Sequence, residues 1–249
     1  MSSHPPIGEV DGKAEAIEDM FDAVAPRYDL LNRVLSLGID RYWRTRTVRL
    51  LADEQPTRVL DVATGTADLA IKAERMLHPR KIVGVDLSAE MLAHGREKLD
   101  RLGLSPRISL VQGDAATLPF EDGAFDAALV AFGVRNFEDL HAGLRDIRRV
   151  LRPGGTLVVL EFSRPRRFPI KQLYAWYNRH VLPRIGGTLS PAQSAYEYLP
   201  RSVAAFPDGT DFLDRMDTAG FTDLLWTPLT FGIVSLYRGV VPHRSPSAS

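Results

Sequence analysis

The chain contains no cysteine among its 249 residues. Disulfide bonds, iron–sulfur clusters and thiolate zinc sites are therefore excluded. Covalent catalysis through sulfur is excluded as well, including the addition of a thiolate to a pyrimidine ring before that ring is modified. The absence fits a reducing compartment but does not require one.

A surplus of charge of one sign is also missing, because 31 Lys and Arg residues balance 31 Asp and Glu residues. Such a chain has no overall attraction to nucleic acid or to an anionic membrane, although a local basic patch can exist. No stretch approaches the roughly 20 apolar residues of a membrane-spanning helix, and no secretory signal is recognisable. We expect a soluble, cytoplasmic protein. The six histidines show no paired spacing, so no metal site is predicted.

From residue 58 onward, short β-branched runs alternate with helical patterns, as in a parallel α/β sheet. Strands are expected at 58–62, 81–86, 108–112, 125–132, 156–162, 222–228 and 232–240, and helices at 69–77, 90–102, 139–151 and 211–219. The last two strands are too close in the chain for a parallel crossover, so they should pair antiparallel. The predicted fold is α/β and Rossmann-like, a mostly parallel seven-stranded sheet with an antiparallel last strand and helices on both faces.

A single domain is expected over residues 1–240. It includes an N-terminal helical lid at about 13–50 and a helical insertion at about 163–207, which should cover the C-terminal edge of the sheet. Residues 241–249 are expected to form a disordered tail.

Residues 61–68 (DVATGTAD) connect a predicted strand to a helix, where a doubly wound sheet brings its backbone close to a nucleotide. Gly65 is the only glycine there, so the segment alone could equally be a structural turn. Asp86 ends the next strand 21 residues after Gly65, a spacing typical of an acid that binds ribose hydroxyls. Asp114 follows the third strand and could accept from an adenine amino group or only close a turn. Met91 could lie on the adenine face, although Met on a helix is more often core.

The loop carries Thr64, Thr66 and Ala67 in place of further glycines, and it contains no Lys or Arg. A pyrophosphate would need several backbone N–H groups at close approach. The loop therefore favours an adenosine ligand without phosphate, neutral or cationic, over a dinucleotide.

Four segments resemble the motifs of class I S-adenosylmethionine-dependent methyltransferases: VLDVATGTAD, VGVDLSAEML, GDAATLPF and RVLRPGGTLVVLEF. Three more resemble the ubiquinone/menaquinone biosynthesis C-methyltransferase family: YDLLNRVLSLGIDRYW at 28–43, FGVRNFED at 132–139 and SAYEYLPRSVAAFP at 194–207. The resemblance covers about residues 21–240. It implies the class I methyltransferase fold, S-adenosylmethionine as cofactor, and methyl transfer to a ring carbon of a polyprenylated quinol.

The resemblance implies cofactor contacts at Thr66, Asp86, Asp114 and Ala115, to which we add Gly65 and Met91. The chain departs from the family pattern at Leu31, Asp40, Ala67 and Ala131, where the family usually has Met, His, Gly and Ser. Ala131 should cost one hydrogen bond to the cofactor, and without His at position 40 we assign no catalytic role there.

Arg135 and Asn136 directly follow the fourth predicted strand, where strand ends face the ligand crevice. We expect Arg135 to stabilise a developing quinolate and Asn136 to hold the second oxygen or a water. The alternative is a helix start beside a salt-bridged Arg. Because Arg stays protonated, a water or a nearby oxygen should take the quinol proton. In the lid, Tyr28 and Asp29 should help to exclude water, and Asp29 could accept a proton or merely cap a helix.

Two further groups have open roles. Tyr196 and Tyr198 could line a quinone channel or only pack. The basic residues Arg164, Arg166, Arg167 and Lys171 lie beside the aromatic stretch 173–177. They could form a solvated loop, or place the protein peripherally on the anionic inner face of the membrane that holds a polyprenyl substrate.

Our preferred acceptor is demethylmenaquinol, in menaquinone biosynthesis, and the alternative is the benzoquinol of the ubiquinone pathway. An RNA methyltransferase is disfavoured by the balanced charge and by the lack of an NPPY-type motif. A nicotinamide-dependent dehydrogenase is disfavoured by the single-glycine loop, and a non-catalytic adenosyl-binding module by the intact FGVRN motif. The oligomeric state stays open, a dimer included.

Overall fold

One seven-stranded sheet forms the centre of the computed structural model, which describes residues 20, 22, 25, 28–177, 180 and 193–243. Its strand order is β3-β2-β1-β4-β5-β7-β6. The strands are β1 (Arg58–Val62), β2 (Lys81–Asp86), β3 (Ile108–Gln112), β4 (Phe125–Ala131), β5 (Leu151–Phe162), β6 (Thr222–Leu229) and β7 (Val234–Val240). The first five strands pair parallel, whereas β7 is antiparallel to both neighbours, β5 and β6. The predicted fold is confirmed.

One strand begins earlier than predicted. Residues 152–155, which fall between the predicted helix and the predicted strand, lie inside β5, and α6 (Leu140–Val150) stops directly before that strand. The pairing of β4 with β5 shifts register here, from Phe125↔Leu151 to Ala127↔Thr156. The Pro-Gly-Gly sequence therefore makes a bulge within the strand, with Gly154 at a φ of 77°.

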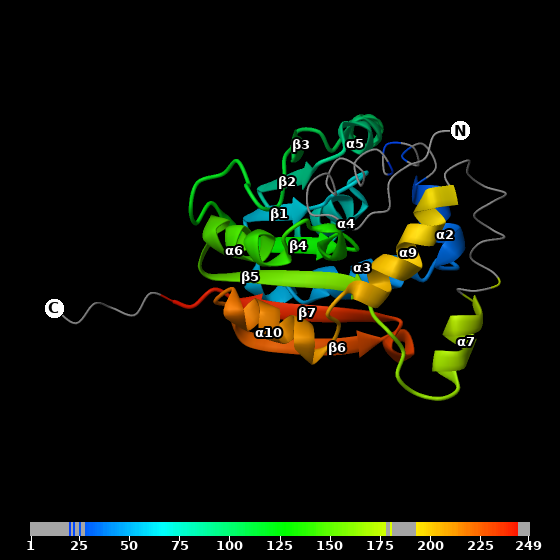
Figure 1. Ribbon diagram of the computed structural model, residues 1–249. Coiled ribbons are helices and arrows are strands. Elements are labelled where there is room, and N and C mark those ends of the chain that lie inside the picture. Colours follow the sequence, from blue (N-terminus) through cyan, green and yellow to red (C-terminus); the bar gives the residue numbers. More distant parts are fainter. Residues whose placement is uncertain are drawn as a thin grey trace.

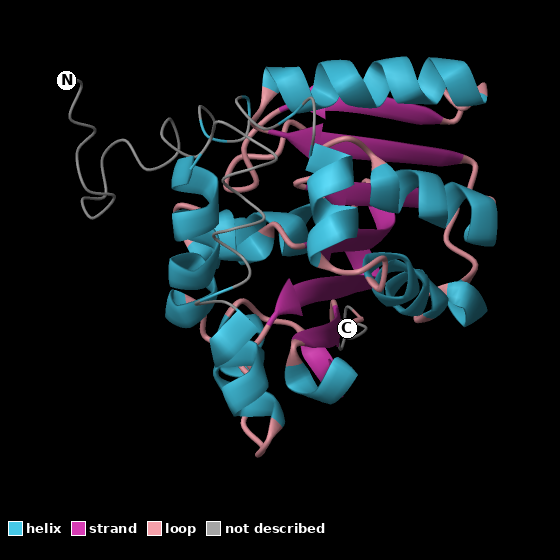
Figure 2. Ribbon diagram, turned by 90° about the vertical axis from the view of Figure 1, so that its right-hand side faces the viewer, coloured by secondary structure: helices cyan, strands magenta, loops and turns pink. Residues whose placement is uncertain are grey.

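Helices cover both faces of the sheet (Figures 1 and 2). On one face, α6 and α10 (Thr210–Thr218) pack against a buried row formed by Leu60, Ala128 and Leu157, which are in register across β1, β4 and β5. The opposite face packs against α3 (Asp40–Arg49), α4 (Asp68–Leu77) and α5 (Ala89–Leu102). Successive strand residues point to opposite faces, so strands covered on both sides are largely apolar.

Three helices lie at the end of the molecule to which the parallel strands point, on the right in Figure 1. They are α2 (Tyr28–Leu35), α7 (Ile170–Trp176) and α9 (Gln193–Ala205). Most of residues 1–27, residues 178–179 and 181–192 of the predicted insertion, and residues 244–249 of the predicted tail lie outside the described residues. The division into domain, lid, insertion and tail stays a prediction.

None of the helices that the structure describes combines the length and the apolar character needed to cross a membrane.

Candidate active site

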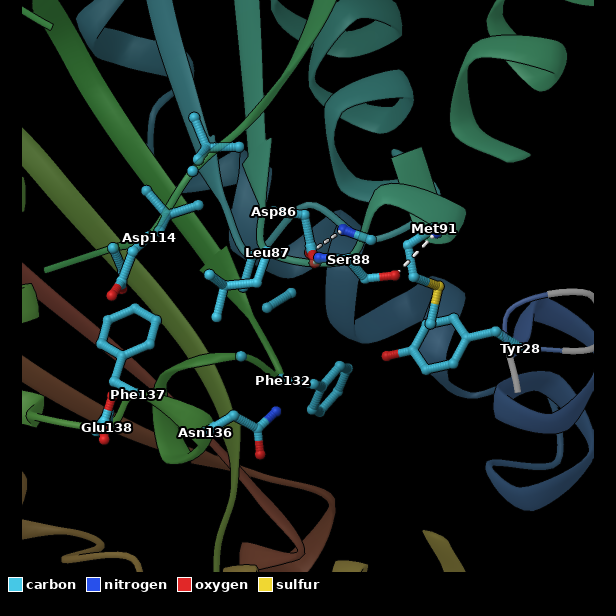
Figure 3. A pocket seen from close by; sticks show the side chains of 18 residues that line it. Tyr28, Asp86, Leu87, Ser88, Met91, Asp114, Phe132, Asn136, Phe137 and Glu138 are labelled. Carbon is cyan, nitrogen blue, oxygen red and sulfur yellow. Dashed lines mark hydrogen bonds between the residues drawn. The ribbon is translucent and has the colours of Figure 1, made fainter. Parts of the chain in front are cut away.

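A cleft lies at the carboxyl ends of β1, β2 and β4, enclosing about 780 Å³ with the space at its open mouth included (Figure 3). Small-molecule sites of open α/β sheets lie in this position, at the carboxyl ends of the strands. Of the predicted site residues, the cleft is lined by Tyr28, Gly65, Asp86, Met91, Asp114, Ala115 and Asn136. Asp29, Thr66 and Arg135 are not among its lining residues.

The β1–α4 loop is held against the end of β2 by one carboxylate. Gly65, at a φ of 54°, donates its backbone N–H to Asp86 Oδ2 at 2.7 Å, and the Ser88 N–H donates to Asp86 Oδ1 at 3.0 Å. Ser88 also caps α5, since its Oγ accepts from the Met91 N–H at 3.0 Å. Burial raises the pKa of Asp86, and the backbone N–H groups oppose this. The carboxylate retains lone-pair capacity with which to accept from a diol.

The predicted adenine-binding residues lie at both ends of the cleft. Asp114 and Phe137 are at one end, and Met91 is at the other, on the side of Tyr28 (Figure 3). Asp114 Oδ1 accepts from the Ala116 N–H at 2.9 Å, so this residue closes a turn and also lines the cleft. Leu87 lies between the two ends, and our sequence analysis missed it although it directly follows Asp86.

The lining fits S-adenosylmethionine, which is a nucleoside with a positive sulfonium and no phosphate. Three carboxylates, Asp86, Asp114 and Glu138, line a cleft whose other walls are largely apolar, and none of its lining residues in the described chain is Lys, Arg or His. Carboxylates favour a nearby positive charge and accept from ribose and adenine donors. Ala131 lines the cleft without a side-chain donor, as its identity predicts.

Thr66 and Asp29 belong to a network at one side of the cleft, which we call the lid latch (Asp29, Thr66, Asp68 and Lys98). The Thr66 hydroxyl donates to Asp29, and Lys98 Nζ pairs with Asp29. Lys98 also donates to Thr66 at 3.0 Å and to Asp68 at 2.9 Å. Burial alone would raise the pKa of Asp68, but Arg44 and Lys98 hold it below its usual value. Lys98 was missed from sequence, where nothing distinguishes it from other helical lysines.

The two residues of the predicted acceptor site point in different directions. Asn136 lines the cleft, and its Oδ1 accepts from the Tyr198 hydroxyl at 3.0 Å. Arg135 instead donates through Nη1 to Glu161 Oε1 at 2.8 Å and to the Phe132 carbonyl, and through Nε to Ser202 at 3.3 Å. Its Nη2 has no acceptor among the described residues, so the predicted contact with a quinolate stays a prediction.

Glu161, the partner of Arg135, is a buried carboxylate that our sequence analysis missed. Its side chain is 0% exposed, and it accepts from the Phe162 N–H at 2.8 Å in addition to Arg135. Burial raises the pKa of Glu161, and the charge of Arg135 opposes that effect. The only signal in the sequence was an acid near the end of the otherwise apolar LVVLEF strand.

Aromatic rings border the Asn136 side of the cleft. Phe132 lines the cleft and packs against Trp43 of α3 and Phe162 of β5, with ring centroids 6.1 and 4.5 Å away. Tyr28 of α2 lines the same cleft, and burial raises its pKa. This wall offers apolar, aromatic surface next to the Asn136 amide.

The structure shows the surroundings of two residues that depart from the family pattern, Asp40 and Ala67. Asp40 is buried and pairs with Arg44, and it also accepts from the Ser36 hydroxyl at 2.9 Å. Ala67 has a φ of 67°, a left-handed conformation that favours glycine. In the described part of the chain, no cluster of three or more His, Asp or Glu residues could hold a metal ion.

A mostly parallel seven-stranded sheet with an antiparallel β7, and a phosphate-free nucleoside cleft at its carboxyl edge, define a class I S-adenosylmethionine-dependent methyltransferase. The fold is similar to the solved structure of the [4+2]-cyclase SpnF, with a TM-score of 0.63, 19% identity, and coverage of 92% of this chain and 96% of that one. It is equally similar to a methyltransferase of Thermotoga maritima described as a possible histamine N-methyltransferase, with a TM-score of 0.62, 19% identity, and coverage of 90% and 99%. At this identity the two structures support the fold alone.

The chain belongs to the ubiE/COQ5 methyltransferase family, whose family model matches residues 9–241. It is 48% identical over 228 residues to the demethylmenaquinone methyltransferase of Bacteroides fragilis, covering 91% of this chain and 93% of that protein. The enzyme of the same name from Deinococcus radiodurans is 45% identical over 237 residues, with coverage of 95% and 97%. The Geobacter sulfurreducens ubiquinone/menaquinone biosynthesis C-methyltransferase UbiE is 46% identical over 228 residues, with coverage of 91% and 89%.

These matches confirm the predicted family, the predicted enzyme class and S-adenosylmethionine as the cofactor. The names of these relatives describe the predicted reaction, a methylation in menaquinone or ubiquinone biosynthesis. The dehydrogenase hypothesis is wrong, because the family consists of methyltransferases.

Proposed function

We propose that this enzyme methylates a ring carbon of demethylmenaquinol in menaquinone biosynthesis. The observation that carries the proposal is the wall beside Asn136, where the amide lies next to the ring of Phe132, with the ring of Tyr28 farther along the same cleft (Figure 3). An aromatic acceptor with hydroxyl groups can stack on such rings and exchange hydrogen bonds with the amide. The names of the relatives from Bacteroides and Deinococcus support the same acceptor.

For this reaction the protein must position the acceptor and stabilise the negative charge that develops on it. When bound, S-adenosylmethionine supplies an electrophilic methyl carbon whose bond electrons return to sulfur. The electron-rich quinol carbon forms the new C–C bond, and one proton leaves the ring system for water. Asn136 and the aromatic wall align the acceptor, which is worth up to ~7–11 kcal/mol in favourable cases. The Asn136 amide stabilises negative charge on the quinol oxygen as that proton leaves.

The test is anaerobic incubation of the enzyme with S-adenosylmethionine and a reduced acceptor, followed by mass analysis of the lipid product. We expect a gain of one methyl group on demethylmenaquinol. The UbiE names of other relatives favour the benzoquinol of the ubiquinone pathway as the second candidate, so it is assayed in parallel. Methylation of the benzoquinol alone would reassign the acceptor, and methylation of neither would overturn the proposal.

We also propose that the end of the molecule carrying α7 rests on an anionic bilayer, where a polyprenylated acceptor resides. Exposed apolar side chains gather on this segment, with Phe168 81% exposed, Leu173 60% and Trp176 56%. The helix lies at the end to which the parallel strands point (Figure 1). Of the four predicted basic residues, Arg164 and Arg166 pair with the buried Asp208, which leaves Arg167 and Lys171 to meet lipid headgroups.

Flotation with phosphatidylglycerol-containing vesicles tests this surface. Replacement of Arg167 and Lys171 by Gln, and separately of Phe168 and Trp176 by Ser, should each reduce vesicle binding several-fold. Leu102→Ser, at an exposed apolar residue of α5, is the matched control and should float like the wild type. Unchanged binding in both double variants would contradict the proposed membrane contact.

A further inference from the structure

Tyr198, on α9, reaches across 62 residues of sequence to the cleft. Its hydroxyl donates to Asn136 Oδ1 at 3.0 Å, and its own ring is only partly exposed. Burial raises the pKa of Tyr198, so the hydroxyl keeps its proton and stays a donor. Asn136 is thus held by a helix none of whose described side chains lines the cleft.

This hydrogen bond fixes which end of the Asn136 amide faces the cleft. An amide presents an acceptor oxygen and a donor nitrogen on opposite prongs. With Oδ1 turned to Tyr198, the amide nitrogen points toward the interior of the cleft, on the side of Phe132 and Leu87 (Figure 3). No described residue accepts from that nitrogen. In the flipped amide the Tyr198 hydroxyl would have to accept, and no described residue would accept its proton.

Arg135 cannot easily take over this role, because three of its contacts hold the guanidinium away from the cleft lining. Glu161, the Phe132 carbonyl and Ser202 accept from it, and its side chain is only 6% exposed. Ser202 lies four residues after Tyr198 on α9, so one face of this helix holds both Arg135 and Asn136.

We propose that Tyr198 is a positioning residue for methyl transfer: it orients Asn136 so that the amide N–H₂ group meets the developing quinolate oxygen. The inference rests on the proposed function for the identity of the acceptor as a quinol. Tyr198 itself touches neither reactant. Its hydroxyl affects methyl transfer only by orienting the Asn136 amide. Tyr198 is therefore a positioning residue and not a catalytic one.

The kinetic test is a double-mutant cycle on turnover at saturating S-adenosylmethionine. Tyr198→Phe should lower kcat about tenfold, and Asn136→Ala about 100-fold, with cofactor affinity within twofold of wild type. The double variant should be no slower than Asn136→Ala alone, because the hydroxyl has nothing left to orient. Tyr42→Phe, at a half-exposed tyrosine of α3, is the matched control and should turn over like the wild type.

A second measurement does not depend on the acceptor. The Asn136 side-chain amide resonances, assigned by their loss in Asn136→Ala, should shift in Tyr198→Phe with S-adenosylhomocysteine bound, and should not move in Tyr42→Phe. Unshifted amide resonances, a wild-type kcat in Tyr198→Phe, or additive losses in the double variant would each overturn the inference. Wild-type enzyme that methylates neither quinol would instead refute the proposed function, and the resonances would still decide the orientation of the amide.

Discussion

Arg135 and Glu161 form an ion pair in which both side chains are buried, with Nη1 and Oε1 2.8 Å apart and exposed fractions of 6% and 0%. The backbone N–H of Arg135 also donates to Glu161 Oε2 at 3.3 Å. The carboxylate of β5 therefore fixes both the side chain and the backbone of η3 (Val134–Asn136), the short turn that presents Asn136 to the cleft. Removing one partner of such a pair leaves a buried charge without compensation.

Glu161→Gln is expected to lower the free energy of unfolding by about 3–5 kcal/mol, because Arg135 would keep its charge in a buried setting. Urea denaturation measures the change. Replacing both residues by Met removes both charges and should recover most of the loss. Glu54→Gln, in the 28% exposed pair with Arg238, is the control and should cost less than ~1 kcal/mol. Equal losses at the buried and the exposed pair would contradict this account.

The sequence predicted the sheet well because its strands are covered on both faces. Nearly continuous apolar runs such as 125–132 are typical of such strands, and the bounds of β1, β2 and β3 agree with the prediction. The acids at the carboxyl ends of β2 and β3 could be found for a similar reason. The carboxyl ends of parallel strands meet at one edge, so Asp86 and Asp114 had to lie close together.

Side-chain direction and long-range pairing could not be predicted in the same way. Nothing in FGVRN indicates that Arg135 turns toward Glu161 while its neighbour Asn136 faces the cleft, since both follow the same strand. Lys98 meets Asp29 across 69 residues, and a helical periodicity cannot reveal that partner. These contacts depend on how α2, α5 and α9 pack, which no local pattern encodes.

The lid latch predicts a defect in cofactor binding. Lys98→Met removes the cation that joins Asp29 of α2 to Asp68 of α4, so Tyr28 should be held less firmly over the cleft. We expect the Kd of S-adenosylmethionine to rise about tenfold, and Asp29→Asn to give a similar rise that does not add to it. Calorimetric titration measures both, and Arg101→Met, at an exposed position of α5, should bind like the wild type.

The same two variants test whether Asp29 accepts a proton. If Asp29 only holds the lid, both variants should keep a similar kcat once the cofactor is saturating. A kcat much lower in Asp29→Asn than in Lys98→Met would instead support the catalytic alternative. Additive effects on the Kd would contradict a shared latch.

The buried carboxyl group of Asp61 is expected to make the stability of the protein depend on pH. The Asp61 side chain is almost fully buried behind the cofactor loop, and burial raises its pKa from 3.8 to about 7, opposed by donors at Thr64 and Ala70. Between these two pH values the folded chain binds a proton that the unfolded chain has lost. Stability therefore falls as pH rises from about 4 to about 7, by up to ~4 kcal/mol in total, and this contribution is constant outside that window.

Comparison with Asp61→Asn isolates this effect, since the variant has no titrating group at the position. The difference in unfolding free energy between variant and wild type, measured in urea at intervals from pH 4 to pH 8, should shift in favour of the variant and level off above about 7. A difference that stays constant across the window would show that Asp61 is ionised in the folded chain throughout.

Glycine substitutions at Ala67 and at Ala73 are expected to change the stability of the protein in opposite directions. The φ of 67° at Ala67 places an L side chain in the left-handed region, which costs ~1–2 kcal/mol. Ala67→Gly relieves that strain, partly offset by the greater chain entropy of glycine and the loss of a buried methyl group, so a gain of up to ~1 kcal/mol is expected. Ala73→Gly, at an equally buried position inside α4, should instead lose ~1 kcal/mol or more. Thermal unfolding with bound S-adenosylhomocysteine and without it measures both variants, and a change of the same sign at the two positions would contradict the strain at Ala67.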